Sequence, residues 1–183
     1  METDSSLEMR SPSAFKGMTL SQVCDFVESR HHAYAQKELP GLIQLTERVA
    51  IVHGKHDPRL MAVRDYFLES ANAFSAHIQK EGGVLFPMIR SLETDASYGD
   101  SRWDYIIDPI EQMRLEHEGV ELSLEKIRKL TDSFLVPAHA CNTYRSMLYG
   151  LQAFYANFHQ HSDVENNVLF PRALRKVDRI DPE

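Results

Sequence analysis

The sequence predicts an all-α protein, an up-and-down antiparallel four-helix bundle built from two similar helical hairpins. Apolar residues recur at steps of three, four or seven along four segments, which is the period of one helix face. Two stretches 84 residues apart are also near copies: FSAHIQKEGGVLFP over residues 74–87 and FHQHSDVENNVLFP over residues 158–171 agree at seven of fourteen positions. Nothing reads convincingly as a strand, so four helices with short connections predict a bundle.

The first helix follows a leader without periodicity. Residues 1–18 are expected to be this flexible leader, and Thr19 is the expected N-cap. From there the sequence is helical in composition to about residue 50, with Pro40 bending the helix. Its inward stripe comprises Phe26, His32, Leu39, Ile43 and Thr46.

The second helix follows the segment HGKHDP, which breaks the chain at residues 53–58. Asp57 with Pro58 is a cap and first-turn signal. The inward stripe of this helix comprises Leu60, Val63, Phe67, Phe74, His77, Glu81 and Leu85. A histidine and a glutamate four residues apart therefore lie on its core face.

The third helix follows the expected long connection at residues 91–103. Asp108 with Pro109 repeats the cap signal, and the helix is expected to run to about Phe134. Its stripe comprises Ile110, Met113, His117, Glu121, Leu124 and Ile127.

The fourth helix follows a break at Val136 and Pro137. Its stripe comprises Met147, Leu151, Phe154, Phe158, His161, Glu165 and Leu169. We assign residues 19–175 to the bundle domain and residues 176–183 to a C-terminal tail.

The repeat extends to a histidine on each preceding helix. His32 precedes His77 by 45 residues, and His117 precedes His161 by 44. Two hairpins related by a pseudo-twofold axis would bring four histidines and two glutamates to one level of the interior. The candidate metal ligands are His32, His77, Glu81, His117, His161 and Glu165.

These residue types suit a site for two metal ions. A buried carboxylate without a partner costs several kcal/mol, and no Lys or Arg occupies the stripes beside Glu81 and Glu165. Imidazole suits iron, copper, nickel and zinc, and carboxylates can bridge two ions. Two histidines per ion, two bridging glutamates and an oxo or hydroxo bridge give each metal five ligands and one open position.

The repeat does not assign positions to the other polar residues. Glu121 follows His117 by four, so it is an extra ligand, an outer acceptor for an imidazole N–H, a proton-handling carboxylate or an exposed helix residue. His31 and His159 point about 100° and 200° away from the histidines beside them, so we expect them outward or behind the ligands. The exposed bystanders are expected to be His53, His56 and His139. The repeated Val-Leu-Phe-Pro letters are interpreted as packing around a helix end or kink at each proline.

Composition excludes several classes of function. The 183 residues are 43% hydrophobic and 26% charged, no apolar run approaches the ~18–20 residues that cross a bilayer, and the polar, acidic start is no secretory signal. A formal charge of −7 argues against a nucleic-acid partner. Cys24 and Cys141 fit a reducing cytoplasm, with a single disulfide between them left open. We expect a cytoplasmic protein without a membrane or nucleic-acid partner.

At the candidate metal ligands and the segments around them, the chain resembles the hemerythrin-like di-iron proteins, and within them the iron–sulfur cluster repair family of the RIC or YtfE/ScdA type. The likeness covers roughly residues 20–175. It is carried by ENNVLFPRAL at 165–174 with His161 upstream, by HIQKEGGVLFPMI at 77–89, by KELPGLI at 37–43 with His32 before it, and by EHE around His117.

The resemblance implies a non-heme di-iron site in which the four candidate histidines are terminal ligands and Glu81 and Glu165 bridge two iron ions. It also implies a cytoplasmic protein of the nitric oxide and oxidative stress response, which binds NO or O2 and helps restore damaged iron–sulfur clusters of a transient client protein. Repair proteins of this type carry an N-terminal domain with adjacent cysteines, and we expect this chain to lack it. Hemerythrins place another ligand one turn after the third-helix histidine, where this chain has Glu121.

Two other functions are compatible with the same site. One is an O2 or NO carrier or sensor without repair activity; the other is a di-iron oxidoreductase that reduces NO, O2 or peroxide. Histidine-rich ligation favours binding over oxidation, so we expect a ligand-binding protein rather than an enzyme, with turnover left open. The sequence is compatible with a monomer or a homodimer.

Overall fold

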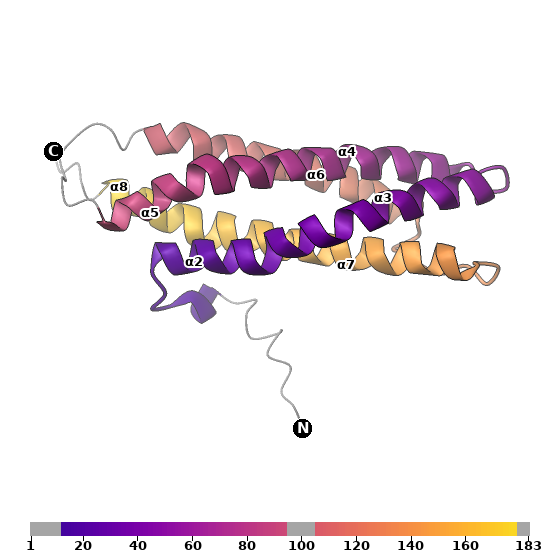
Figure 1. The fold of residues 1–183 in the computed structure, drawn as a ribbon, viewed down its shortest axis with the longest axis horizontal. Coiled ribbons are helices and arrows are strands. Elements are labelled where there is room, and N and C mark those ends of the chain that lie inside the picture. The colour runs from indigo at the N-terminus through magenta and orange to yellow at the C-terminus, as the bar shows by residue number, and fades with distance from the viewer. Residues whose placement is uncertain (1–11, 95–104, 179–183) are drawn as a thin grey trace, which may run out of the picture.

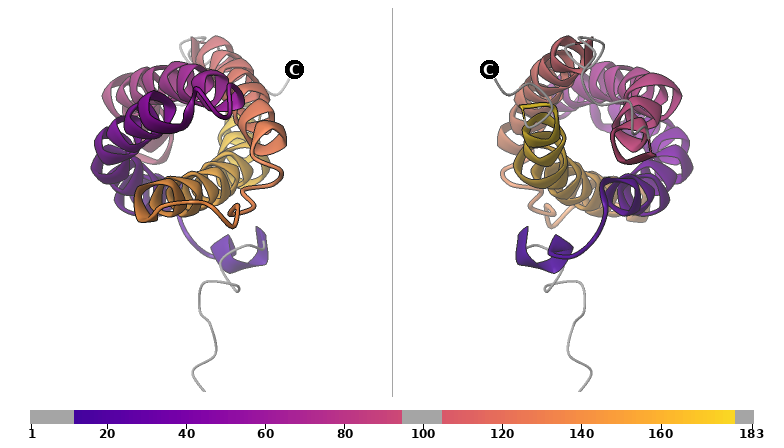
Figure 2. Two further views of the ribbon diagram at one scale, coloured as in Figure 1. Left: turned by 90° about the vertical axis from the view of Figure 1, so that its right-hand side faces the viewer. Right: turned by 90° about the vertical axis from the view of Figure 1, so that its left-hand side faces the viewer.

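The computed structural model describes residues 12–94 and 105–178, and these form an antiparallel four-helix bundle (Figure 1). No strand occurs within these two ranges. The end-on views of Figure 2 show the helices arranged around one common axis. A short 3-10 helix, η1 (Pro12–Phe15), precedes four long helical stretches: α2 (Leu20–Val27), η2 (Glu28–His32) and α3 (Ala33–His53); α4 (Arg59–Lys80), η3 (Glu81–Leu85) and α5 (Phe86–Thr94); α6 (Ile107–Leu130); and α7 (Asn142–Val164), η5 (Glu165–Leu169) and α8 (Phe170–Asp178).

The bundle begins at Thr19, as the sequence predicts. The Thr19 hydroxyl accepts the backbone N–H of Gln22, and the Gln22 side chain accepts the backbone N–H of Thr19, which is a capping box. The end of the expected leader is more ordered than its composition indicates. Phe15 in η1 is buried and packs edge-on against Phe26, 5.2 Å between ring centroids; residues 1–11 lie outside the described ranges.

Helix ends differ from the sequence expectation in several places. The α3 helix contains Pro40 and continues to His53, past the expected end at about residue 50. The α6 helix begins at Ile107, so Asp108 and Pro109 lie in its first turn rather than at its cap. It also ends at Leu130, before the expected end at Phe134, because the chain then turns through left-handed backbone conformations. Most of the expected central connection lies outside the described residues.

Three of the long stretches contain a π-helical segment, which the periodicity did not predict. The backbone N–H of Phe86 donates to the carbonyl of Glu81, five residues earlier, and the N–H of Phe170 donates to that of Glu165. Pro87 and Pro171 follow these donors directly, and in a regular α-helix their rings would clash with the carbonyl four residues back. The wider turn accommodates each proline, so the helical stretch continues through it and does not end there.

Two apolar clusters fill the bundle, one on each side of the level that holds the His and Glu side chains of both halves. Along the fourth stretch Phe158 belongs to the first cluster and Val164 to the second, with His161 between them. A set of ionisable groups is therefore held in a layer between two hydrophobic cores. Such groups are costly to bury unless they are paired or bind metal.

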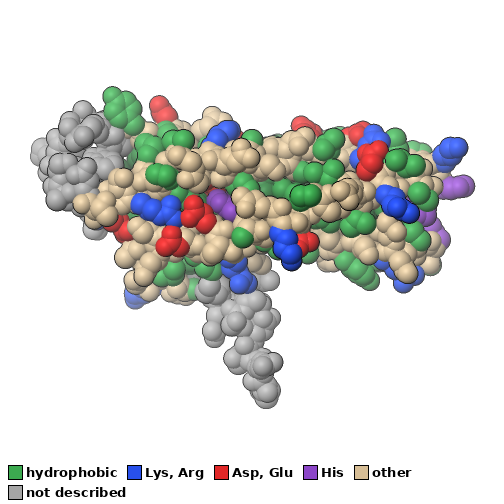
Figure 3. Space-filling view, in the orientation of Figure 1, with side chains coloured by type: hydrophobic (Ala, Val, Ile, Leu, Met, Phe, Trp, Pro, Cys, Tyr) green, Lys and Arg blue, Asp and Glu red, His purple; other side chains and the backbone are tan. Residues whose placement is uncertain are grey.

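The surface carries both signs of charge. On the face drawn in Figure 3, basic and acidic side chains are interspersed along the helices. Among the described helices, none is long and apolar enough to cross a membrane.

Candidate metal centre

Five of the six predicted ligand residues come together in the layer between the two clusters. One donor atom from each lies within 4.8 Å of the others: His77, Glu81, His117, His161 and Glu165. They come from the α4–η3 junction, the middle of α6 and the α7–η5 junction. All five are buried, and Glu81 and Glu165 have 0% of their surface exposed.

The sixth residue, His32, lies at the end of η2 and approaches Glu81 from the opposite side. Its Nε2 atom lies 3.1 Å from Oε2 of Glu81. The other oxygen, Oε1, lies 3.2 Å from Nε2 of His77. The two oxygens of Glu81 thus face imidazoles from two different helical stretches, which is the arrangement that a bridging carboxylate needs.

Glu165 faces the other two imidazoles. Its Oε2 atom lies 3.1 Å from Nε2 of His117 and 3.3 Å from Nε2 of His161. The imidazole nitrogens also converge on one another, with 3.0 Å between Nε2 of His117 and of His77, and 3.2 Å between Nε2 of His117 and of His161. All four histidines therefore direct the same ring nitrogen inward.

Outer contacts explain why it is Nε2 that faces inward. Nδ1 of His77 lies 3.2 Å from a carboxylate oxygen of Glu116, and Nδ1 of His117 lies 3.4 Å from the amide oxygen of Asn166. Both acceptors favour a proton on Nδ1, which leaves the lone pair of Nε2 directed at the centre. The sequence reasoning missed Glu116 and Asn166 because neither lies on an apolar stripe. The sequence signal that could have found them is their position, since Glu116 directly precedes His117 and Asn166 directly follows Glu165.

The side chains of the cluster do not by themselves supply enough positive charge for both buried carboxylates. Burial alone raises the pKa of Glu81, but the positive charge of His77 outweighs it and holds this pKa well below the usual range. Burial, together with the negative charge of Glu81, raises the pKa of Glu165 well above its usual range. Two adjacent carboxylates in a dry interior cannot both ionise without added positive charge.

The hydrogen bonding points to the same need. Neither oxygen of Glu81 and neither oxygen of Glu165 accepts a hydrogen bond of good geometry, although all four are buried. Buried polar atoms are almost always satisfied, so four unpaired carboxylate oxygens beside converging imidazole nitrogens fit a bound cation. Imidazole and carboxylate donors in this number fit transition-metal ions such as iron.

Aromatic rings wall the cluster, and sequence reasoning gave them only a packing role. The ring of Phe86 stacks on His32 with 5.6 Å between centroids and 10° between planes, and that of Phe170 stacks on His117 at 6.3 Å and 11°. These are the phenylalanines of the two Val-Leu-Phe-Pro repeats. Phe86 therefore covers the histidine from the first helix of the N-terminal half, and Phe170 covers the histidine from the first helix of the C-terminal half. Their appearance at equivalent places in both repeats was the available signal.

Glu121 is not part of the cluster, and the expectation that it shares the inward face of His117 is wrong. Its side chain is 49% exposed and lies 3.8 Å from Nδ1 of His159. The same four-residue step brings Glu81 and Glu165 inward where π-helical segments begin, whereas α6 is regular α-helix around Glu121.

His31 was expected either outward or behind the ligands, and the structure places it behind them. It is 1% exposed, and its ring lies edge-on to His161 with 6.1 Å between centroids. Burial, followed by the nearby charge of Arg30, lowers the pKa of His31 to about 4. His31 therefore stays neutral near pH 7 and packs behind a candidate ligand.

The cysteines and the remaining histidines lie outside the cluster. Both thiols are free, so the disulfide left open by the sequence does not form. Cys24 is buried, which raises its pKa to about 12. Exposed Cys141 lies 3.4 Å from Nε2 of His53 near the far end of the bundle. His56 and His139 are exposed, as expected, whereas His53 is half-buried.

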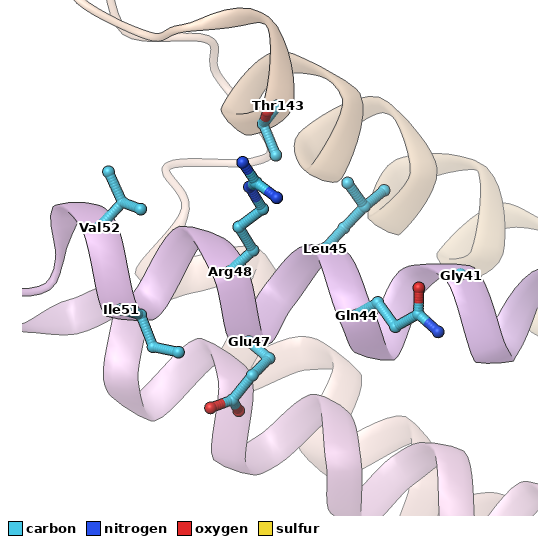
Figure 4. Close-up of a pocket in the computed structure, with 8 residues that line it drawn as sticks. All are labelled: Gly41, Gln44, Leu45, Glu47, Arg48, Ile51, Val52 and Thr143. Atoms are coloured by element: carbon cyan, nitrogen blue, oxygen red, sulfur yellow. The ribbon is translucent and has the colours of Figure 1, made fainter.

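A separate surface groove of about 750 Å³ follows the outer side of α3 (Figure 4). It runs from Gly41 to Val52, with Thr143 of α7 at its edge, and the side chain of Arg48 extends toward Thr143. Gly41 lies nine residues beyond His32 on the same continuous helix, a rise of roughly 13 Å. This groove is therefore distinct from the candidate metal centre.

Comparison with known proteins finds a matching family and similar individual proteins. Residues 27–173 match the model of the family described as "Hemerythrin HHE cation binding domain". The chain is 36% identical over 172 residues to the iron–sulfur cluster repair protein YtfE of Yersinia pseudotuberculosis serotype IB (strain PB1/+), with 92% of this chain and 72% of that protein covered. The protein of the same name from Yersinia pestis (strain Pestoides F) is 35% identical over the same shares of the two chains.

Proposed function

The chain belongs to the hemerythrin HHE cation-binding domain family and is similar to its iron–sulfur cluster repair proteins, and from this we propose that it holds a bridged pair of iron ions and assists the repair of damaged iron–sulfur clusters. The proposed ligands are His32, His77, Glu81, His117, His161 and Glu165. In this assignment the histidines are terminal ligands and the glutamates bridge.

One observation carries the proposal. The four carboxylate oxygens of Glu81 and Glu165 are buried without hydrogen-bond partners, and Nε2 atoms of four histidines lie 3.1 to 3.3 Å from three of these oxygens. Only bound cations satisfy acceptor oxygens and imidazole lone pairs together. Two carboxylates also match the charge of two cations better than that of one.

Bound iron would supply open coordination positions for NO or O2 and a reversible one-electron change between ferrous and ferric states. The protein supplies the rest. Glu116 and Asn166 hold His77 and His117 in the tautomer that presents Nε2 inward. Phe86 and Phe170 cover the imidazoles of His32 and His117 and exclude water from that side.

We place this activity in the cytoplasm, as part of a response to nitric oxide and oxidative stress, with an iron–sulfur protein as the transient partner. Two free thiols fit a reducing compartment. The relatives' printed name, iron–sulfur cluster repair protein, supports the partner class.

The test is recovery of a purified [4Fe–4S] hydro-lyase that has been inactivated with NO. Stoichiometric iron-loaded protein should restore hydro-lyase activity. Glu81→Gln should restore little, because it removes a proposed bridge. The matched control Glu121→Gln makes the same change at an exposed glutamate outside the cluster and should restore activity as the natural chain does.

Other outcomes decide between the remaining functions. A reversible spectral change with NO or O2 and no recovery of the hydro-lyase would replace repair with a carrier or sensor role. Steady consumption of NO or peroxide with a reductant would instead identify an oxidoreductase. Equal recovery by Glu81→Gln and the natural chain would refute the proposed site.

A further inference from the structure

The two halves of the protein match at the ligands but not around them. Residues 84 or 85 positions apart correspond, so His77 matches His161, His117 matches His32 and Glu81 matches Glu165. The same offset can be applied to the groups that contact the outer nitrogens of these histidines. There the correspondence fails twice, and both failures favour the same pair of histidines.

The first difference is at Glu116, which corresponds to His31. The carboxylate of Glu116 lies 3.2 Å from Nδ1 of His77. It is fixed in place by Lys80, whose Nζ donates to it at 2.6 Å, and by Gln112, whose amide donates at 2.9 Å. Its side chain is 18% exposed, so solvent screens it only in part.

In the other half the matching positions hold an imidazole and no anion. His31 lies beside His161, with 6.1 Å between ring centroids. Nδ1 of His161 is buried and has no hydrogen-bond partner. Thus His77 has a carboxylate behind its Nδ1 atom, whereas its counterpart His161 has none.

The second difference is at Asn166, which corresponds to Gly82. The amide oxygen of Asn166 lies 3.4 Å from Nδ1 of His117. Gly82 has no side chain to offer His32 in the equivalent way. Space is not the reason, since a Cβ at Gly82 would meet only Oε1 of Glu28, at 3.6 Å.

Pairing of the histidines follows from the same pseudo-symmetry. Nε2 of His77 lies 3.0 Å from Nε2 of His117 and 3.4 Å from Nε2 of His161, whereas His32 faces the other oxygen of Glu81. The matched pair, His32 and His161, has 5.2 Å between ring centroids. One ion is therefore assigned to His77 with His117, and the other to His32 with His161.

We propose that Glu116 is a positioning residue that makes the two metal positions unequal, so that the ion held by His77 and His117 binds more tightly than the ion held by His32 and His161. This inference rests on the proposed two-metal function. A carboxylate that accepts the Nδ1 proton fixes the ring and strengthens Nε2 as a donor, and loss of such a partner typically costs 10- to 100-fold in metal affinity.

The test is an anaerobic titration of the metal-free protein with Fe2+ in competition with a chromogenic chelator. The natural chain should bind in two separate steps. Glu116→Gln keeps the size of the side chain but removes its charge, and should weaken the tighter step about 10- to 100-fold while leaving the weaker step in place. The thermal midpoint of the metal-free protein should stay close to that of the natural chain, which separates positioning from a general structural role.

Two further variants complete the design. Glu118→Gln makes the same charge change at an exposed glutamate on the other side of His117, and should leave both steps unchanged. Gly82→Asn gives His32 the counterpart of Asn166, and should strengthen the weaker step so that the two steps approach each other.

The outcomes separate this inference from the proposed function. Two steps that Glu116→Gln leaves unchanged, or weakens equally, would overturn the inference but not the two-metal site. Failure of the natural chain to bind two ions would instead overturn the proposed function.

Discussion

Two side chains of the cluster hold protons that a metal ion must displace. Burial lowers the pKa of His77, but the charge of Glu81 outweighs it, so this pKa lies above its ordinary value of 6.5. Burial and the charge of Glu81 also raise the pKa of Glu165 well above its ordinary value of 4.5. His117, whose pKa burial lowers to about 4, is already neutral at pH 6.5.

The affinity for metal should therefore rise with pH. Ligation requires deprotonated His77 and Glu165, and each proton released on binding makes the apparent affinity grow as protons become scarcer. We expect Fe2+ affinity to increase as the pH is raised through 6.5 and to continue rising until both groups are deprotonated in the metal-free protein. Calorimetry in buffers of different ionisation enthalpy measures the released protons. A pH-independent affinity with no proton release would contradict this electrostatic account.

The candidate ligands were predictable because duplication and helical spacing mark them twice. The residues that contact the outer nitrogens of these ligands, Glu116 and Asn166, were not predictable in this way. Glu116 contacts His77 across two helices, and no period within one helix announces a contact between different helices. For His31 helical spacing left two positions open, outward or behind the ligands, and packing against His161 decides for the second.

At the scale of elements, the turn after α6 carries the clearest strain. Asp132, Ser133 and Phe134 have φ values of 51°, 61° and 63°, a left-handed conformation that side chains disfavour. Contacts hold them there: Arg59 pairs with Asp132 at 3.1 Å, Arg128 donates to the hydroxyl of Ser133 at 3.1 Å, and Phe134 is buried.

Ser133→Gly should stabilise the protein. Glycine removes the left-handed penalty of roughly 1–2 kcal/mol and gives back about 0.5–1 kcal/mol through its greater freedom in the unfolded chain. The free energy of unfolding by urea should rise by about 0.5–1 kcal/mol. Ser91→Gly, in the right-handed α5 helix, is the control and should lower it. A loss of stability in Ser133→Gly would mean that the Arg128 contact matters more than the backbone.

The existence and order of the helices could be predicted, whereas their irregularities could not. Pro40 was expected to bend α3, and it lies inside this helix, which continues to His53. Pro87 and Pro171 also lie within continuous helices, because the preceding π-helical turns accommodate them. A proline in a sequence signals a local clash, and packing against the rest of the bundle decides whether the helix ends or widens.

For the whole molecule, the central feature is a polar layer between two hydrophobic clusters. Apolar packing on both sides fixes the four helical stretches, and so the interior positions of four imidazoles and two carboxylates. Such a layer is expensive without bound cations. The duplicated His-Glu unit therefore makes sense as a metal site whose folding cost is offset by metal binding.

The most direct test is the metal content per chain of protein purified from cells grown with iron, read together with its visible spectrum before and after reduction. We expect about two irons per chain, with near-ultraviolet oxo-bridge bands that bleach on reduction. A stable, folded bundle with little iron, or with tightly bound zinc in its place, would contradict the di-iron assignment and the repair function that rests on it.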